Sequence, residues 1–217
     1  MTLLDPNKQA PDMAAKITGE ACELGTDAIM VGGSTGVTQE NLDATIVAIK
    51  ARVDVPVIYF PSGAHAISPH SDAIYFMSML NSRLVEMTTR QQMKGAPIVR
   101  KLGIEPISMG YVIVAPGMKV GEVGQADCVP RDRPDIAAAY ALAAQYMGMQ
   151  SVYLEAGSGA PQHVPEEMIR AVRSTIDIPL LVGGGIRDAE AASRVRKAGA
   201  NIVVTGTIVE NGNYRDR

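Results

Sequence analysis

The chain has 217 residues, of which 47% are apolar and 20% charged, and its formal net charge is −3. This length and apolar content suit a single α/β domain over residues 1–217, whereas the slight acidity excludes the extended basic surface of a nucleic-acid-binding protein. The longest apolar run, residues 136–144, is too short to span a membrane. No signal peptide is recognisable, and Cys22 and Cys128 have no metal-ligand spacing, so we expect free thiols in a cytoplasmic protein.

The first 80 residues alternate short apolar runs with helical patterns. Strands are expected at residues 2–5, 28–31 and 56–60. Helices are expected at residues 8–24 and from the capping residue Thr38 to about Arg52. Residues 72–80 fit a buried strand or a helix by periodicity alone, and we interpret them as the fourth strand. Only residues 63–71 then remain for the third connection, which is too short for a full helix.

The rest of the chain continues the same alternation. We expect helices at residues 85–102, 134–148, 164–175 and from the capping residue Asp188 to Gly199. Strands are expected at residues 106–114, 151–155, 180–182 and 202–204. The short polar segment after Val209 makes a complete eighth helix unexpected. Eight strands alternating with about seven helices predict a (β/α)₈ TIM-type barrel with a reduced third helix and short termini.

Two strands near the C-terminus end in glycine. Gly183, Gly184 and Gly185 follow the seventh strand, and Gly206 and Thr207 follow the eighth. Glycine lets backbone N–H groups approach a ligand closely, and a nearby helix N-terminus favours an anion. Loops seven and eight of such barrels often bind phosphate, so we predict a phosphate site here. The alternative is that glycine simply ends these strands.

Catalytic groups of such a barrel lie at the C-terminal ends of strands, which singles out two carboxylates. Asp5 could bind Mg²⁺ together with a substrate phosphate, or it could be a turn residue before Pro6. Glu155 could be a base that faces a substrate hydroxyl, or one half of a buried ion pair.

Lys8 and Arg187 lie near strand ends and could neutralise phosphate, although solvated surface positions would also explain them. His65, His70 and His163 lack a metal-ligand pattern, so we interpret them as ordinary loop residues.

At this point the sequence resembles the geranylgeranylglyceryl phosphate synthase family, which includes bacterial heptaprenylglyceryl phosphate synthases. The most specific motif is Tyr153-Leu154-Glu155-Ala156-Gly157-Ser158-Gly159, whose Ala-Gly-Ser-Gly form is typical of the larger of the family's two groups. The other matching segments are residues 4–8, 31–36, 59–61, 72–82, 111–117, 182–187 and 204–207. The resemblance therefore covers nearly the whole chain.

The resemblance implies an Mg²⁺-dependent prenyltransferase of archaeal-type ether-lipid synthesis. Such an enzyme joins sn-glycerol 1-phosphate to a polyprenyl diphosphate, here most simply geranylgeranyl diphosphate, and releases diphosphate. By resemblance, Asp5 and Ser34 hold Mg²⁺ and the diphosphate, and Glu155 is the catalytic base. The glycerol phosphate site is then formed by Tyr153, Leu154, Glu155, Ala156, Gly157, Ser158, Gly159, Gly183, Gly184, Gly185, Gly206 and Thr207. A homo-oligomer with peripheral membrane contact is also expected.

The sequence departs from the family pattern after Asn81 and Ser82, where residues 83–87 replace an Asn-Pro-aromatic stretch. Asn81 and Ser82 themselves resemble a family motif, and the sequence assigns them no role. Three alternatives remain open: a sugar-phosphate isomerase or lyase, a flavin mononucleotide oxidoreductase, and a binding protein without activity. Asp5 and Glu155 argue against the last of these.

Overall fold

The structure is a computed structural model that describes residues 1–206. Within this range, eight parallel strands form one sheet in chain order, β1 to β8. Their bounds are β1 Thr2–Leu4, β2 Ile29–Val31, β3 Val57–Tyr59, β4 Ala73–Met79, β5 Glu105–Ile113, β6 Ser151–Glu155, β7 Leu180–Gly183 and β8 Ile202–Val204. Parallel strands in chain order with helical connections are the topology of a (β/α)₈ barrel, so the predicted fold class is confirmed. Thr207 and the segment where an eighth helix was not expected lie outside the described residues.

Helices connect most successive strands. Their bounds are α1 Pro11–Glu23, α2 Gln39–Lys50, α3 Gln91–Leu102, α4 Met118–Val123, α5 Pro134–Tyr146, α6 Glu166–Arg173 and α7 Ala189–Lys197. Two predicted capping residues are confirmed. Thr38 and Asn41 form a reciprocal capping box at the start of α2, and the Asp188 carboxylate accepts the Ala191 N–H at 2.7 Å at the start of α7.

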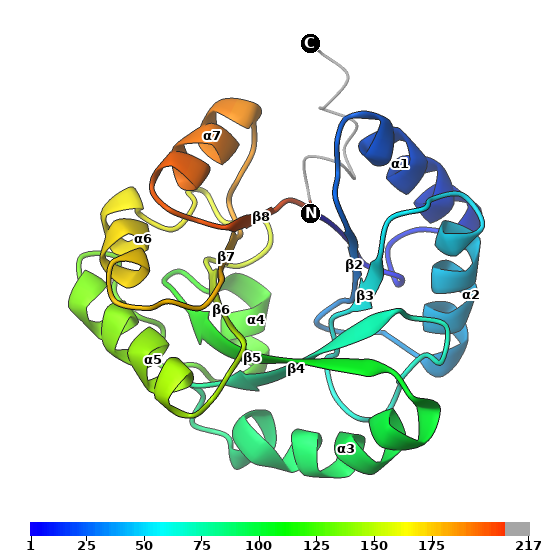
Figure 1. The fold of residues 1–217 in the computed structure, drawn as a ribbon, viewed down its shortest axis with the longest axis horizontal. Helices are drawn as coiled ribbons and strands as arrows, with labels where there is room; N and C mark the ends of the chain where they lie inside the picture. The colour runs from blue at the N-terminus through cyan, green and yellow to red at the C-terminus, as the bar shows by residue number, and fades with distance from the viewer. Residues whose placement is uncertain (207–217) are drawn as a thin grey trace. The chain divides into compact units, whose positions relative to one another are not determined.

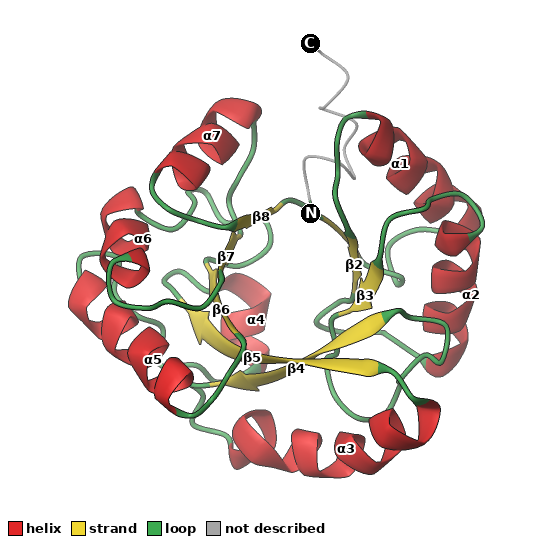
Figure 2. Cartoon of the chain, in the orientation of Figure 1, coloured by secondary structure: helices red, strands yellow, loops and turns green. Residues whose placement is uncertain are grey.

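The third connection carries no helix, as the sequence predicted. Figure 2 shows only loop between β3 and β4. The ambiguous segment is a strand, as expected: Ala73–Met79 form β4, which pairs in parallel with β3. Its first residues Ala73, Ile74 and Tyr75 are all buried, as in a strand packed on both faces, so they show no alternation.

The connection after β4 differs from the expected single helix. A π-helical turn, Glu86–Arg90, precedes α3, and Pro97 lies inside α3 without a backbone N–H to donate. The sequence prediction also missed α4. This helix has six residues and is bounded by Gly117 and Gly124, so its apolar pattern is too short to detect.

The chain divides into two compact units. The N-terminal unit comprises Met1–Phe76 and Arg90–Ile107, and the C-terminal unit comprises Met77–Thr89 and the chain from Ser108 onward. In the N-terminal unit, α1 and α2 pack side by side along β1, β2 and β3 (Figure 1). Fully buried Leu4, Met30 and Ile46 belong to its core.

In the C-terminal unit, α5, α6 and α7 follow one another along the outer side of β6, β7 and β8 (Figure 1). A continuous apolar cluster joins them, and it includes the fully buried Leu154 and Val182 from the strands and Met168 and Val195 from the helices. This cluster fixes one face of β6 and β7 against the helices and leaves the opposite face for the groups described below.

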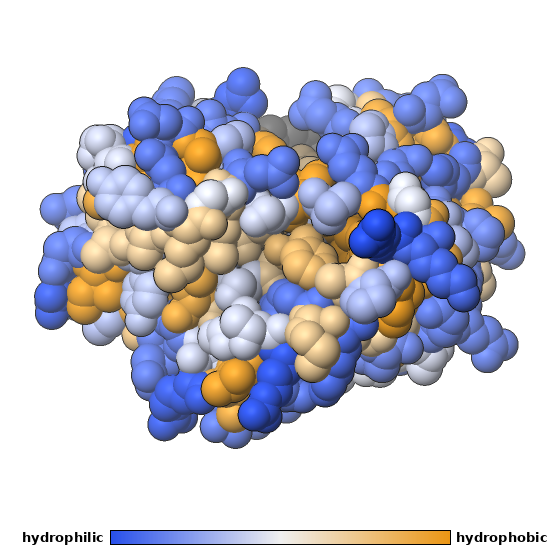
Figure 3. Space-filling view, turned by 60° about the horizontal axis from the view of Figure 1, so that its bottom comes forward, coloured by the Kyte–Doolittle hydropathy of each residue, from blue (hydrophilic) through white to orange (hydrophobic). Residues whose placement is uncertain are grey.

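Apolar residues also reach the surface. Figure 3 shows orange residues interrupting the hydrophilic surface on one side of the molecule. In the C-terminal unit, Tyr146 and Met147 at the end of α5 are 79% and 70% exposed.

Among residues 1–206, no helix combines the length and apolar character needed to cross a membrane.

Candidate active site

Successive side chains of β6 point to opposite faces of the sheet. Val152 and Leu154 point into the apolar cluster beneath the helices, so Tyr153 and Glu155 point to the opposite face. Leu154 and Ala156, both expected in the substrate site, have side chains in that cluster. They can contact a substrate only through their backbone.

Glu155 is the central charged group of this face. Only 6% of the residue is exposed, and it lies in register with Ile113 of β5 and Gly183 of β7. Its Oε1 accepts the Gly157 N–H at 2.7 Å. No Lys or Arg pairs with Glu155 within residues 1–206, so the interpretation as half of a buried ion pair is wrong there.

Burial raises the pKa of Glu155, while hydrogen bonds from the Tyr153 hydroxyl and the Gly157 N–H act in the opposite direction. The Tyr153 ring is itself packed against Tyr111, with ring centroids 5.2 Å apart. The desolvated carboxylate is thus held in place by neutral donors. A carboxyl group in this state is suited to accept a proton from a bound hydroxyl.

The three glycines after β7 each face a different group. A Cβ at Gly183 would overlap the Tyr153 hydroxyl, one at Gly184 would overlap Glu155 Oε1, and one at Gly185 would overlap the backbone of Gln162. Gly184 and Gly185 also have φ angles of +80° and +69°. The sequence predicted that a ligand phosphate approaches these glycines, and in the structure the groups that lie this close to them are protein groups.

The loop after β6 carries the remaining motif residues. Gly157 has a φ of +99°, and a Cβ there would lie 2.6 Å from the Gly117 carbonyl oxygen. Ser158 and Gly159 are exposed. The structure therefore brings together Tyr153, Glu155, Gly157 and Gly184, while Gly206 lies just beyond β8 and Thr207 lies outside the described residues.

Asp5 and Ser34 belong to the N-terminal unit, at the ends of β1 and β2. Gly33, which precedes Ser34, is in close contact with Asp5, because a Cβ at Gly33 would overlap the Asp5 carboxylate. Asp5 Oδ1 accepts the Asn7 N–H at 3.0 Å, and Lys8 Nζ lies 4.0 Å from Asp5 Oδ2. A carboxylate and a hydroxyl on adjacent strand ends are oxygen donors of the kind that Mg²⁺ prefers.

Asn81 and Ser82, which the sequence left without a role, join three segments of the C-terminal unit. The Asn81 amide donates to the carbonyls of Ile113 and Asp127 at 2.8 and 2.9 Å and accepts the Ile113 N–H at 3.1 Å. Ser82 Oγ donates to the Gly124 carbonyl at 2.6 Å. These contacts join the end of β4 to the end of β5 and to the segment after α4, so both residues have a structural role.

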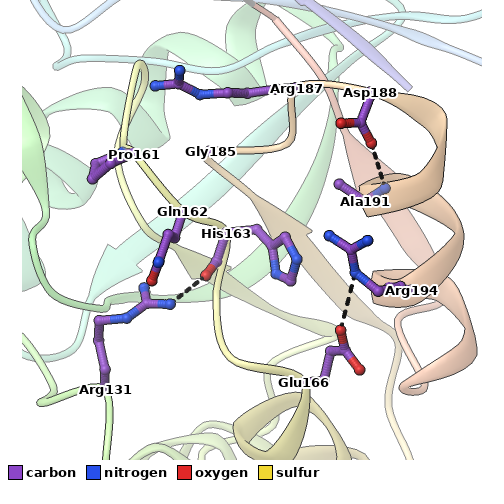
Figure 4. A pocket seen from close by; sticks show the side chains of 10 residues that line it. All are labelled: Arg131, Pro161, Gln162, His163, Glu166, Gly185, Arg187, Asp188, Ala191 and Arg194. Carbon is purple, nitrogen blue, oxygen red and sulfur yellow. Dashed lines mark hydrogen bonds and ion pairs between the residues drawn. The ribbon is translucent and has the colours of Figure 1, made fainter.

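A cavity of about 340 Å³ is lined by residues of the β6–α6 loop, of the turn after β7 and of α7 (Figure 4). The charged and polar residues around it include Arg131, Gln162, His163, Glu166, Arg187 and Arg194. Arg187 donates to the Ala160 carbonyl at 3.2 Å, and Arg131 donates to the His163 carbonyl at 2.9 Å. His163 Nδ1 is 2.7 Å from the Val164 carbonyl oxygen, and His65 Nε2 is 3.0 Å from the Val37 carbonyl oxygen, so both histidines contact backbone carbonyls.

Comparison with known proteins connects this arrangement to a family. The family model described as "PcrB family" matches residues 1–217. The geranylgeranylglyceryl phosphate synthase of Pyrococcus horikoshii is 55% identical over 208 residues, which are 96% of this chain and 82% of that protein. The synthase of Methanothermobacter marburgensis is 54% identical over 218 residues, which cover 100% of this chain and 89% of that protein.

A solved structure agrees with these relatives. The (S)-3-O-geranylgeranylglyceryl phosphate synthase of Thermoplasma acidophilum, crystallised with its substrate sn-glycerol-1-phosphate, superposes with a TM-score of 0.94 at 51% identity. The match covers 97% of this chain and 85% of that chain. Fold, length and motifs therefore agree over nearly the whole sequence, and the chain belongs to the PcrB family.

Proposed function

We propose that this protein is a prenyltransferase that joins sn-glycerol 1-phosphate to a polyprenyl diphosphate and releases diphosphate. The proposed donor is geranylgeranyl diphosphate, and the product is an ether-linked prenylglyceryl phosphate of archaeal-type lipid synthesis. The observation that carries the proposal is the buried Glu155, held by Gly157 and beside the glycine turn of β7, in a chain of this family. Family membership also favours this reaction over a sugar-phosphate isomerase or a flavin oxidoreductase.

In the proposed reaction, Glu155 accepts the proton of the glycerol hydroxyl while that oxygen attacks C1 of the prenyl chain. The new C–O ether bond forms as the bond from C1 to the diphosphate oxygen breaks. Tyr153 and Gly157 keep the Glu155 carboxylate oriented for this transfer. The backbone amides of Ser158, Gly159, Gly183, Gly184, Gly185 and Gly206, with Thr207, would bind the phosphate of the acceptor. The Gly157 N–H stays on Glu155, so Gly157 contributes to the acceptor site by positioning that carboxylate.

Mg²⁺ is the proposed cofactor, and Asp5 and Ser34 would hold it. Residues 1–206 contain no cluster of three or more His, Cys, Asp or Glu side chains that could cage a metal. One carboxylate, one hydroxyl and substrate oxygens are a usual Mg²⁺ environment, so the residues fit an ion that arrives with the diphosphate. When bound, Mg²⁺ would neutralise the departing diphosphate.

The test is a reconstituted reaction. Purified protein is incubated with Mg²⁺, labelled sn-glycerol 1-phosphate and prenyl diphosphates of different lengths, and the ether product and diphosphate are quantified. We expect product with sn-glycerol 1-phosphate and little with its enantiomer, sn-glycerol 3-phosphate. Absence of ether product with every donor length would refute the proposal.

The proposed function also implies a cellular setting. We expect a cytoplasmic homo-oligomer that touches membranes peripherally to obtain its donor and deliver its product. Free Cys22 and Cys128 are consistent with a reducing compartment, and exposed Tyr146 and Met147 are consistent with an intermolecular contact. Light scattering of the purified protein measures the oligomeric state directly.

A further inference from the structure

The loop between β6 and α6 is anchored in the apolar cluster by Ala156, Ala160 and Val164, and the exposed segments between these residues depend on other contacts. It contains Gly157 and Gly159, both with positive φ, and glycine gives a chain more conformational freedom to lose on ordering than any other residue. Ser158 and Gly159 are exposed. A loop of this kind needs contacts from neighbouring segments to keep one conformation.

Two arginines from different segments supply such contacts. Arg187, in the turn after β7, donates to the carbonyls of Gly159 and Ala160 at 3.4 and 3.2 Å. Arg131, in the connection before α5, donates to the carbonyl of His163 at 2.9 Å and to that of Ala115 at 3.4 Å. Figure 4 shows the two guanidinium groups on opposite sides of the loop that carries Pro161 and Gln162.

These two arginines differ from their neighbours in what they bind. Arg194, at the same cavity, pairs with Glu166 at 3.2 Å and Glu190 at 3.0 Å. Within residues 1–206, neither Arg131 nor Arg187 has a carboxylate partner, and every hydrogen bond that they donate goes to a backbone carbonyl. A charged donor on a carbonyl makes a stronger hydrogen bond than a neutral one. Three of the four carbonyls belong to the β6–α6 loop.

We infer that Arg131 and Arg187 are positioning residues that hold the β6–α6 loop in the conformation that binds glycerol phosphate. This inference rests on the proposed function, because that function assigns Gly157, Ser158 and Gly159 to the acceptor site. Without the two arginines, the loop would spend less time in the competent conformation. The apparent affinity for the acceptor then falls in proportion to the fraction of molecules whose loop is in the competent conformation. The chemical step in the assembled complex is unchanged.

The variants are Arg131→Met and Arg187→Met, which keep the aliphatic stem and remove the donors, and the corresponding lysine variants, which keep a charged donor. Arg194→Met is the matched control, since it removes a guanidinium from the same cavity but not from the loop. Hydrogen exchange of residues 158–163 is measured without substrate, and steady-state kinetics are measured for both substrates.

A rise of about tenfold in KM requires the competent fraction of the loop to fall to about one tenth, so the loop amides of Arg131→Met and Arg187→Met should exchange at nearly the rate of an unprotected chain. We expect slower exchange in the lysine variants and wild-type exchange in Arg194→Met. The KM for sn-glycerol 1-phosphate should rise about tenfold, while kcat and the KM for the prenyl diphosphate stay within about twofold. Unchanged loop exchange in both methionine variants would overturn the inference, as would faster exchange without a rise in KM. If the wild-type protein forms no ether, the proposed function fails, and the exchange data still decide whether the arginines hold the loop.

Discussion

Gly184 lies so close to the Glu155 carboxylate that a Cβ on Gly184 would overlap Glu155 Oε1. The same Cβ would lie 2.6 Å from the Gly157 nitrogen, which donates to that oxygen. The turn after β7 and the carboxylate of β6 therefore constrain each other directly. A substitution at position 184 changes the position of the proposed base as well as the shape of the proposed phosphate site.

The first prediction follows from this contact. Gly184→Ala should lower the free energy of unfolding by about 1–3 kcal/mol more than Gly148→Ala, because only position 184 adds a clash to the strain. Gly148 is the matched control, since its φ of +78° equals that of Gly184 within 2° but no atom lies within 4 Å of its added Cβ. Urea denaturation of both variants measures the difference. Equal losses would show that the Glu155 side chain moves aside freely.

The second prediction concerns Glu155→Gln. The amide keeps the shape and can still accept the Gly157 N–H, but it removes the base and the charge. Turnover should fall by about 10² to 10⁴, with a smaller change in the KM for glycerol phosphate. The melting temperature should hold or rise, because burying an amide costs less than burying a carboxylate. A variant that melts much earlier yet keeps normal turnover would show that Glu155 is structural.

The third prediction concerns pH. Burial raises the pKa of Glu155 above the usual glutamate value, which is about 4.3. The native state therefore binds this proton more tightly than the unfolded chain does. The free energy of unfolding contributed by this group decreases as pH rises from the unfolded to the folded pKa, and it is constant above the folded value.

Turnover has the opposite dependence on pH, because the base must be ionised, so kcat should fall as pH drops through the folded pKa of Glu155. Melting temperatures and kcat are measured over the same acidic range for the wild type and Glu155→Gln. The glutamine variant should lack this contribution to the stability profile. Identical stability profiles for the two proteins would contradict the direction of the pKa shift.

The fourth prediction concerns Asp5. Asp5→Asn keeps an oxygen that can accept the Asn7 N–H, so the turn should stay folded. Loss of the charge should reduce kcat/KM for the prenyl diphosphate by about 10²-fold or more and raise the Mg²⁺ concentration needed for half-maximal rate. Asp12→Asn is the control, because it removes an equal charge from an exposed position in the first turn of α1. Mg²⁺ titrations that coincide for wild type and Asp5→Asn would remove Asp5 from the site.

The fifth prediction concerns Asn81. Its amide makes three hydrogen bonds to Ile113 and Asp127, and the residue is 3% exposed. Asn81→Ala should cost about 2–4 kcal/mol of stability, because each buried backbone group that loses its partner costs about 1–3 kcal/mol. Ser82→Ala should cost less, since Ser82 is only partly buried. Thermal unfolding of both variants measures the two losses of stability. A larger loss in Ser82→Ala than in Asn81→Ala would contradict the structural role given to the Asn81 amide.

How far the sequence could predict this site depends on the distance between interacting residues. The strand-and-helix alternation and the caps Thr38 and Asp188 are local patterns, and the structure confirms them. The inward position of Glu155 also follows from alternation along one strand. Its actual partners, however, include Tyr153, whose hydroxyl position depends on the fold around it.

The roles of Asn81, Arg131 and Arg187 depend on contacts that no local pattern encodes. The partners of Asn81 lie 32 and 46 residues away, and those of Arg187 lie 27 and 28 residues away. The sequence favoured a phosphate or solvent partner for Arg187, and the structure gives it backbone carbonyls instead. Every residue has a backbone carbonyl, so an arginine whose partners are carbonyls has no acidic residue in the sequence that would mark its role.

The glycine turn after β7 has a consequence for attempts to diversify this protein. Gly183 and Gly184 face the side chains of Tyr153 and Glu155, so positions on the two sides of these contacts must be varied together, whereas Gly185 faces the backbone of Gln162, which no substitution removes. A library that randomises residue 183 alone should return glycine, because the phenol oxygen of Tyr153 occupies the space that any side chain would need. A library that also allows Phe at position 153 should recover alanine at position 183, although the selected proteins would lack the hydroxyl that holds Glu155.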